Sequence, residues 1–239
     1  MKTKIIKAGR GFTLVELLVV IVIIAALAGL TAPMVIRQRK KADQTEAVSN
    51  ARQVGLALFE FENEYGSFPE GALGAVINGN TGTELAPTTI TTANDAFRQL
   101  IASGIAQSEV MFYCKTAYST LKPDNVFDTA QEALKKGEVG FGYIMGTGNV
   151  AFSSAGNPGR AILAAPLAYS GTFTAGQFDK EVYDSKAIVL KMDNSVTSLN
   201  INNLGKAVLG GGKTLLDDGQ GTIWGASGLK PIIVNPDPK

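Results

Sequence analysis

A continuous apolar stretch near the N-terminus constrains this chain more than any other feature of its sequence. Residues 12–36 are almost entirely apolar, and no side chain between Leu17 and Leu30 is polar. As an α-helix, a stretch of this length would extend about 37 Å, which is enough to cross a hydrocarbon core of about 30 Å. Four basic residues precede it: Lys2, Lys4, Lys7 and Arg10. The stretch predicts a membrane-spanning helix over residues 12–36.

One acidic residue, Glu16, lies inside this stretch close to its start. A carboxylate near the centre of a bilayer costs about 2.5–3.5 kcal/mol on insertion scales, and less near an interface. Two interpretations follow. Glu16 lies at the depth of the lipid headgroups, or it meets a positive partner inside an assembly.

The sequence around Glu16 resembles a known processing site. Residues 11–16 read Gly-Phe-Thr-Leu-Val-Glu after a basic leader and before a long apolar helix, which resembles the leader site of type IV prepilins and type II secretion pseudopilins. The resemblance implies that a prepilin peptidase cleaves after Gly11 and methylates the new N-terminal residue, Phe12. It also implies that Glu16 pairs with the Phe12 amine of a neighbouring subunit, and that residues 1–11 are a cytoplasmic leader peptide. Pilin helices often carry a proline at the place of Pro33.

A second processing signal lies within the same apolar stretch. Ala26-Leu27-Ala28 has the small-x-small form of a secretory signal-peptidase site. Cleavage there would release a secreted protein beginning at Gly29. Glu16 would interrupt the apolar region of such a signal peptide, and apolar residues continue beyond the site, so the prepilin interpretation is favoured.

The composition argues against most kinds of enzyme and against nucleic-acid binding. The chain has no histidine, which removes histidine-dependent triads and the commonest ligand of transition metals. Its net charge is +1, so no general affinity for nucleic acid is expected. Cys114 is the only cysteine, so an intramolecular disulfide is excluded, and a buried thiol of structural character is expected there.

The helix is predicted to continue beyond the membrane. Apolar residues recur at spacings of three and four up to Tyr65, and Gly66 and Pro69 then end the pattern. Pro33 lacks an N–H group and predicts a kink or a meltable segment. These boundaries divide the chain into a leader (1–11), a long helix (12–66, with 12–36 in the membrane) and a globular domain (67–239).

The first part of the globular domain carries weaker signals. Residues 71–94 are rich in Gly, Thr, Asn and Ala and predict a long surface loop. Asn94 or Asp95 is expected to cap a short helix ending at Ala102, with Phe97 among its inward-facing residues. Residues 109–114 are a candidate strand, and a second short helix is expected over residues 129–136.

The remainder of the domain reads as strands. Candidates are residues 139–145, 160–169 and 229–234, and residues 187–192 and 196–201 form a predicted hairpin around an Asp-Asn-Ser turn. The predicted fold class is α+β, with the long N-terminal helix packed on an antiparallel β-sheet in a pilin-like arrangement.

Two loops near the C-terminus carry partial signatures of ligand sites. Residues 207–214 end in Gly-Gly-Gly-Lys-Thr, but the helix that a phosphate-binding loop requires does not follow. Asp217 and Asp218 precede a Gly-rich turn and are weak calcium candidates. No resident cofactor is expected otherwise.

The predicted function is that of a structural, non-enzymatic subunit of a type IV pilus or a type II secretion pseudopilus. The resemblance implies a precursor in the inner membrane, then a periplasmic or cell-surface filament. The implied partners are further pilin subunits, the prepilin peptidase and an inner-membrane assembly platform. The alternative is a secreted or membrane-tethered binding domain or enzyme unrelated to filaments.

Overall fold

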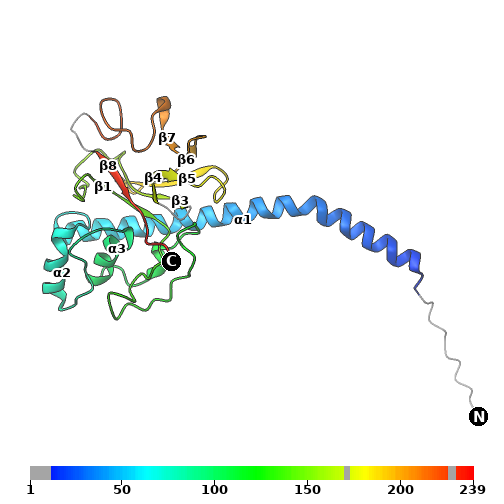
Figure 1. Cartoon of the computed structure of the whole chain (residues 1–239), viewed down its shortest axis with the longest axis horizontal. Helices are drawn as coiled ribbons and strands as arrows, with labels where there is room; N and C mark the ends of the chain where they lie inside the picture. Colours follow the sequence, from blue (N-terminus) through cyan, green and yellow to red (C-terminus); the bar gives the residue numbers. More distant parts are fainter. Residues whose placement is uncertain (1–11, 170–172, 226–229) are drawn as a thin grey trace, which may run out of the picture. The chain divides into compact units, whose positions relative to one another are not determined.

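A single long helix connects the two parts of the chain. The computed structural model describes residues 12–169, 173–225 and 230–239, and it forms two compact units, Met1–Arg39 and Lys40–Lys239. Helix α1 spans Leu14–Tyr65 and contributes its residues to both units (Figure 1). It begins two residues later than expected and ends at Tyr65, one residue before the predicted boundary. It ends there because Gly66 takes a left-handed backbone conformation with φ of 86°. Pro33 lies inside α1, and the helix is continuous across it.

The second unit is built around a six-stranded antiparallel sheet. Its strands are β1 (Gly142–Gly146), β2 (Ala161–Ala165), β5 (Lys186–Lys191), β6 (Val196–Ile201), β7 (Ala207–Val208) and β8 (Pro231–Val234). They lie in the order β7-β6-β5-β2-β1-β8 (Figure 1). A separate two-stranded sheet pairs β3 (Leu167–Tyr169) with β4 (Phe173–Phe178). The predicted antiparallel sheet is confirmed.

The β5–β6 hairpin is confirmed in detail. Leu190 pairs with Val196 across its closing turn, and Asn194 in that turn has φ of 60°, a left-handed conformation that Asn tolerates better than most residues. Two other predicted strands have different bounds in the structure. The strand expected over 139–145 is shorter and begins at Gly142, and the run 160–169 is divided into β2 and β3 at Pro166. The expected start of the last strand at Leu229 lies outside the described residues.

The C-terminal half of α1 packs on this sheet and supplies part of its core. Ala47, Ala51, Val54, Leu58 and Phe61 are each 1% exposed or less. Their spacing of three and four residues places them on one face of the helix. The packing is close enough that a Cβ on Gly55 would lie 2.1 Å from Oδ1 of Asn194 in the β5–β6 turn. The predicted α+β arrangement is therefore confirmed.

The prediction of a long loop over residues 71–94 was wrong. This segment contains a 3₁₀ helix, η1 (Gly71–Leu73), and a helix, α2 (Gly74–Thr81). Ile77 and Ile90 are buried and anchor it to the core. The Asn78 side chain joins α2 to the loop that follows it, because it donates to the Ala86 carbonyl and accepts from the Ala86 N–H. These few contacts cannot be predicted from the composition of the segment.

Two further local predictions were wrong. Residues 109–114 do not form a strand; Glu109–Phe112 is a 3₁₀ helix, η2, capped by the Ser108 hydroxyl. Residues 129–136 form turns rather than a helix. The buried Glu109 carboxylate explains both, because it accepts from the backbone N–H groups of Asn125 and Leu134 and so fixes these loops around itself.

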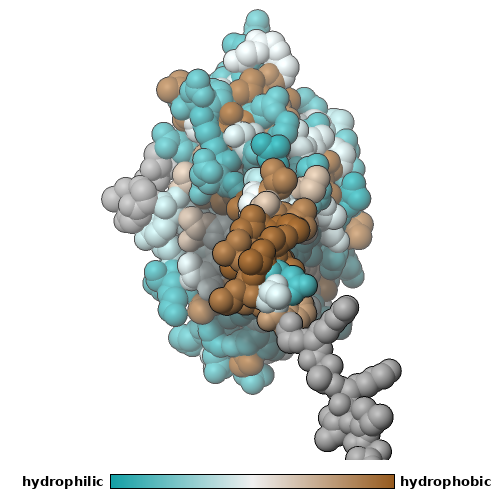
Figure 2. Space-filling view, turned by 90° about the vertical axis from the view of Figure 1, so that its right-hand side faces the viewer, coloured by the Kyte–Doolittle hydropathy of each residue, from teal (hydrophilic) through white to brown (hydrophobic). Residues whose placement is uncertain are grey.

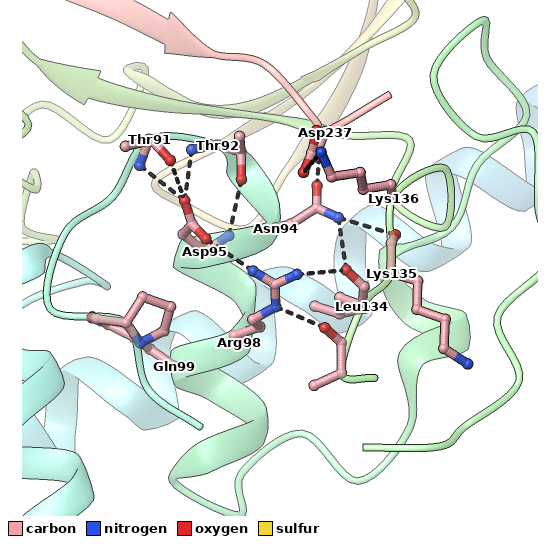
Figure 3. Close-up of polar contacts among 12 residues, drawn as sticks. Thr91, Thr92, Asn94, Asp95, Arg98, Gln99, Leu134, Lys135, Lys136 and Asp237 are labelled. Atoms are coloured by element: carbon pink, nitrogen blue, oxygen red, sulfur yellow. Dashed lines mark hydrogen bonds and ion pairs between the residues drawn. The ribbon is translucent and has the colours of Figure 1, made fainter. Parts of the chain in front are cut away.

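Helix α3 (Ala93–Ala102) ends where expected, but it begins earlier than expected and has a different cap. Thr92 is the N-cap, and Asp95 closes the capping box by accepting from the Thr92 N–H. Figure 3 shows Arg98 of α3 joined to Asp95 and to the carbonyls of Ala133 and Leu134. This polar network attaches α3 to the loop that precedes β1.

The same network holds the C-terminal tail. The Asn94 amide donates to the carbonyl of Leu134, and its oxygen accepts from the Asp237 N–H (Figure 3). Asn94 is fully buried, so both halves of its amide need a partner. Asn94 is therefore a bridge between α3 and the tail rather than a helix cap.

Candidate assembly site in the N-terminal helix

Glu16 and Thr13 form a reciprocal contact at the start of α1. The Thr13 N–H and hydroxyl both donate to Oε2 of Glu16, at 2.9 and 2.7 Å, and the Glu16 N–H donates to the Thr13 hydroxyl at 3.2 Å. This is a capping box, in which two otherwise unpaired donors at a helix N-terminus are satisfied by side chains. The contact fixes the position of the Glu16 carboxylate relative to the first helical turn.

The capping box uses only one carboxylate oxygen of Glu16. Both bonds from Thr13 end on Oε2, and within the described part of the chain no hydrogen bond or ion pair reaches Oε1. Phe12, which precedes Thr13, is 78% exposed. Gly11, after which cleavage is predicted, lies outside the described residues. The site therefore presents an aromatic side chain and a carboxylate oxygen with unused accepting capacity.

Thr13 is the residue of this site that the sequence interpretation missed. The signal was present, because Thr-x-x-Glu directly before an apolar run is the sequence signature of a capping box. It was overlooked because Glu16 was considered only as a membrane or assembly charge.

The apolar surface of the N-terminal half of α1 is exposed throughout. Sixteen large hydrophobic residues between Phe12 and Ile36 are 47% exposed or more. Their side chains make up the continuous brown surface in Figure 2. Among the described residues, α1 is the one helix that is long and apolar enough to cross a membrane.

The calcium candidates near the C-terminus, Asp217 and Asp218, lie in a turn far along the chain from the N-terminal site. The Asp217 carboxylate accepts from the N–H and the hydroxyl of Thr214, and these bonds lower its pKa. Asp217 thus has a local structural role, and nothing in the structure tests calcium binding by Asp217 or Asp218. The Gly-rich segment before them forms a short 3₁₀ helix, η3 (Gly210–Gly212), next to strand β7. The long helix that a phosphate-binding loop requires does not follow η3 among the described residues.

A second acidic group lies in the loops before β1. Glu109, Asp124 and Glu138 each offer an oxygen, and these oxygens lie within 4.8 Å of one another. Backbone N–H groups already donate to Glu109 and Glu138, and the Lys135 ammonium binds Asp124. Burial raises the pKa of both glutamates. The group organises the loops through these internal bonds.

Cys114 is buried, as expected for a structural thiol. It is 1% exposed, and burial raises its pKa well above the ordinary value, which keeps the thiol protonated and unreactive.

Comparison with known proteins identifies the N-terminal segment. Residues 6–32 match the family described as "Prokaryotic N-terminal methylation motif", and this match includes Gly11, Phe12 and Glu16. The N-terminal segment of this chain is therefore similar to the N-terminal segments of pilins and pseudopilins. The predicted resemblance is confirmed.

The curated relatives belong to one kind of secretion apparatus. The chain is 40% identical over 70 residues to "Type II secretion system core protein G" of Dickeya chrysanthemi, covering 28% of this chain and 46% of the relative. It is 43% identical over 58 residues to the protein of the same name from Escherichia coli (strain K12), covering 23% and 40%. It is 37% identical over 71 residues to the protein of the same name from Klebsiella pneumoniae, covering 29% of this chain and 51% of the relative.

This pilin-like chain is therefore related to those proteins over a limited part of its length. It spans about half the length, or less, of these curated relatives. No solved structure shows significant similarity to it.

Proposed function

We propose that this protein is a structural, non-enzymatic subunit of a pseudopilus-type filament. In this proposal it is made as an inner-membrane precursor, is cleaved after Gly11 by a prepilin peptidase, and is then polymerised into a periplasmic filament by an inner-membrane assembly platform. The names of the curated relatives favour a type II secretion pseudopilus over a surface pilus. Its principal partners are other pseudopilin subunits.

The observation that carries the proposal is the exposed apolar half of α1. A contiguous surface of large hydrophobic side chains is unstable in water. A bilayer covers it before assembly, and packing against the same helices of other subunits covers it afterwards. Hydrophobic burial is retained in both states, so a subunit can leave the membrane for a filament without exposing this surface.

Glu16 supplies the specific contact in this mechanism. Cleavage after Gly11 leaves a cationic amine on Phe12. Oxygen Oε1 of Glu16 has no partner in the described part of the chain, and the capping box holds it in place. We propose that it accepts from the Phe12 amine of a neighbouring subunit, which compensates two charges in an apolar environment and sets the axial register.

Glu16→Gln tests this role with little disturbance of the helix start. The Gln side-chain oxygen can still accept from Thr13, but the charge is lost. Because one partner of a buried ion pair is left alone at a cost of about 3–5 kcal/mol, the variant should be cleaved and inserted normally but should fail to enter filaments. The measurement is the yield of sheared filaments beside the amount of mature protein in the membrane fraction.

Thr13→Val is the matched control. It removes the hydroxyl of the capping box and keeps the Glu16 charge, at a cost of about 1 kcal/mol to the helix start. Its filament yield should fall much less than that of Glu16→Gln. A normal filament yield from Glu16→Gln would refute the assembly role of Glu16.

A further inference from the structure

The C-terminal half of α1 has an exposed face as well as a buried one. Exposed residues recur at spacings of three and four along it, within an arc of about 100° at 3.6 residues per turn. This outer stripe consists of Lys41, Thr45, Ser49, Arg52, Leu56, Glu60 and Asn63. It lies entirely within the unit Lys40–Lys239.

The charges of the outer stripe are arranged unfavourably with respect to the dipole of α1. Its first member is Lys41 and its last charged member is Glu60, with Glu64 one turn further on and no basic residue in the last turn of α1. Negative charge near a helix C-terminus opposes the helix dipole, and like charges four residues apart repel. Within the described residues, neither Lys41 nor these two glutamates takes part in an ion pair. The described part of the chain therefore holds no ion pair that compensates these three charges.

An exposed leucine lies beside the acidic end. Leu56 is 62% exposed and precedes Glu60 by one helical turn. A lysine that pairs with Glu60 lies about one turn from Leu56, so its methylene chain can cover part of that leucine.

We propose that the basic end of the outer stripe binds the acidic end of the outer stripe of a second copy of this chain, with Lys41 of one copy against Glu60 of the other. The inference rests on the proposed function, because subunits anchored in one membrane have parallel helices. In parallel helices, this pairing requires an axial shift of 19 residues, or about 29 Å at 1.5 Å per residue. Such a contact uses different ends of the stripe on each copy, and heterologous contacts of this kind produce open filaments rather than closed dimers.

Anionic lipid is the competing partner for the basic end. Arg37, Arg39, Lys40 and Lys41 follow the apolar stretch directly, and such clusters bind negatively charged headgroups. Lipid accounts for the basic residues but not for the glutamates at the far end of the stripe. A second copy accounts for both ends at once.

Charge reversal tests the pairing. Lys41→Glu and Glu60→Lys should each lower the yield of sheared filaments roughly fivefold, since a surface pair is replaced by two like charges. The double variant restores opposite charges in every contact of a homopolymer and should recover most of the wild-type yield. Glu46→Lys, an exposed acid-to-base change off the stripe, should have little effect.

Disulfide cross-linking tests the register independently. A chain carrying Lys41→Cys and Glu60→Cys cannot form the bond internally, because Cα atoms about 29 Å apart exceed the limit of about 7 Å. Native Cys114 is buried and does not interfere. Oxidised filaments should give a ladder of cross-linked chains, and the pair Lys41→Cys with Ser49→Cys should not.

The outcomes separate this inference from the proposed function. A rescued double variant together with a 41–60 ladder supports the pairing. If both single variants lose filaments and the double variant does not recover, the pairing is overturned. Loss from Lys41→Glu alone, with wild-type yield from Glu60→Lys, also overturns it and indicates that the basic end binds anionic lipid. Wild-type yield from both single variants overturns it as well. If the wild-type protein itself yields no filaments, the proposed function fails instead.

Discussion

The two halves of α1 are equally helical but differ in what covers them. In the C-terminal half, Ala51, Leu58 and Phe61 are buried beneath the sheet, whereas in the N-terminal half Leu18 and Ile24 are each more than half exposed. The difference shows that apolar content alone does not define a core. One half contributes to the stability of the globular domain, and in the proposed function the other half presents its surface for assembly. Matched substitutions in the two halves should therefore affect different measurements.

The largest expected effect on stability comes from Phe61→Ala. Phe61 is fully buried and stacks on Tyr65 with ring centroids 4.7 Å apart. The variant should lose about 3–5 kcal/mol in free energy of unfolding, measured by denaturation of the mature protein in detergent. Fluorescence of Trp224, the sole tryptophan, reports on the domain because this side chain is buried.

Leu18→Ala is the counterpart in the exposed half. Leu18 is 58% exposed, so the unfolding transition of the domain should not move, while filament yield should fall. A shift of the unfolding transition by Leu18→Ala would show that the two halves are not separate in function.

Gly29 and Gly55 allow the two halves of α1 to be compared with a single added methyl group. Ala at Gly29 meets nothing within 4 Å, but Ala at Gly55 places its Cβ 2.1 Å from Asn194 Oδ1 and 3.1 Å from Leu190. Gly55→Ala should destabilise the domain by about 1–2 kcal/mol, because crowding outweighs the gain in helix propensity. Gly29→Ala should leave domain unfolding unchanged.

Asn194→Gly provides a rescue of the Gly55 variant. Asn194 has φ of 60°, which Gly adopts freely, and its removal eliminates the nearest clashing atom. The double variant should regain most of the lost stability in the same unfolding experiment. Equal unfolding free energies for Gly55→Ala and the double variant would contradict the assigned contact.

The smallest expected effect is on the pH dependence of stability. Burial raises the pKa of Glu138, and the nearby Glu109 raises it further. Because the folded state holds this proton to higher pH than the unfolded state does, the free energy of unfolding should fall as pH rises from the ordinary carboxyl pKa through the raised value. Glu138→Gln should reduce this slope, measured by denaturation between about pH 4 and 7. A slope unchanged by the substitution would contradict the assignment to Glu138.

The parts of the fold that the sequence predicted correctly are those governed by local pattern. The periodicity up to Tyr65 and the alternation on both sides of Asn194 need only neighbouring residues to be read. The helix α2 was missed because it is held by tertiary contacts of Ile77 and by the Asn78 side chain. The loops around Glu109 were wrong for the same reason, since their conformation follows a buried carboxylate that binds distant backbone groups.

The candidate site was predicted in part. Phe12 and Glu16 were recognised from the leader motif, while Thr13 emerged only from the hydrogen bonds at the start of α1. The outer stripe could not be found from the sequence, because the same spacing fits a buried and an exposed face equally well. Packing of α1 on the sheet decides which residues remain outside.

The N-terminus of the protein recovered from sheared filaments tests the central claim most directly. Mass spectrometry of its N-terminal peptide should show a chain that begins at Phe12 and carries a methyl group on its amine. An intact Met1, or a chain that begins at Gly29, would contradict processing as a prepilin and with it the account of assembly through Glu16.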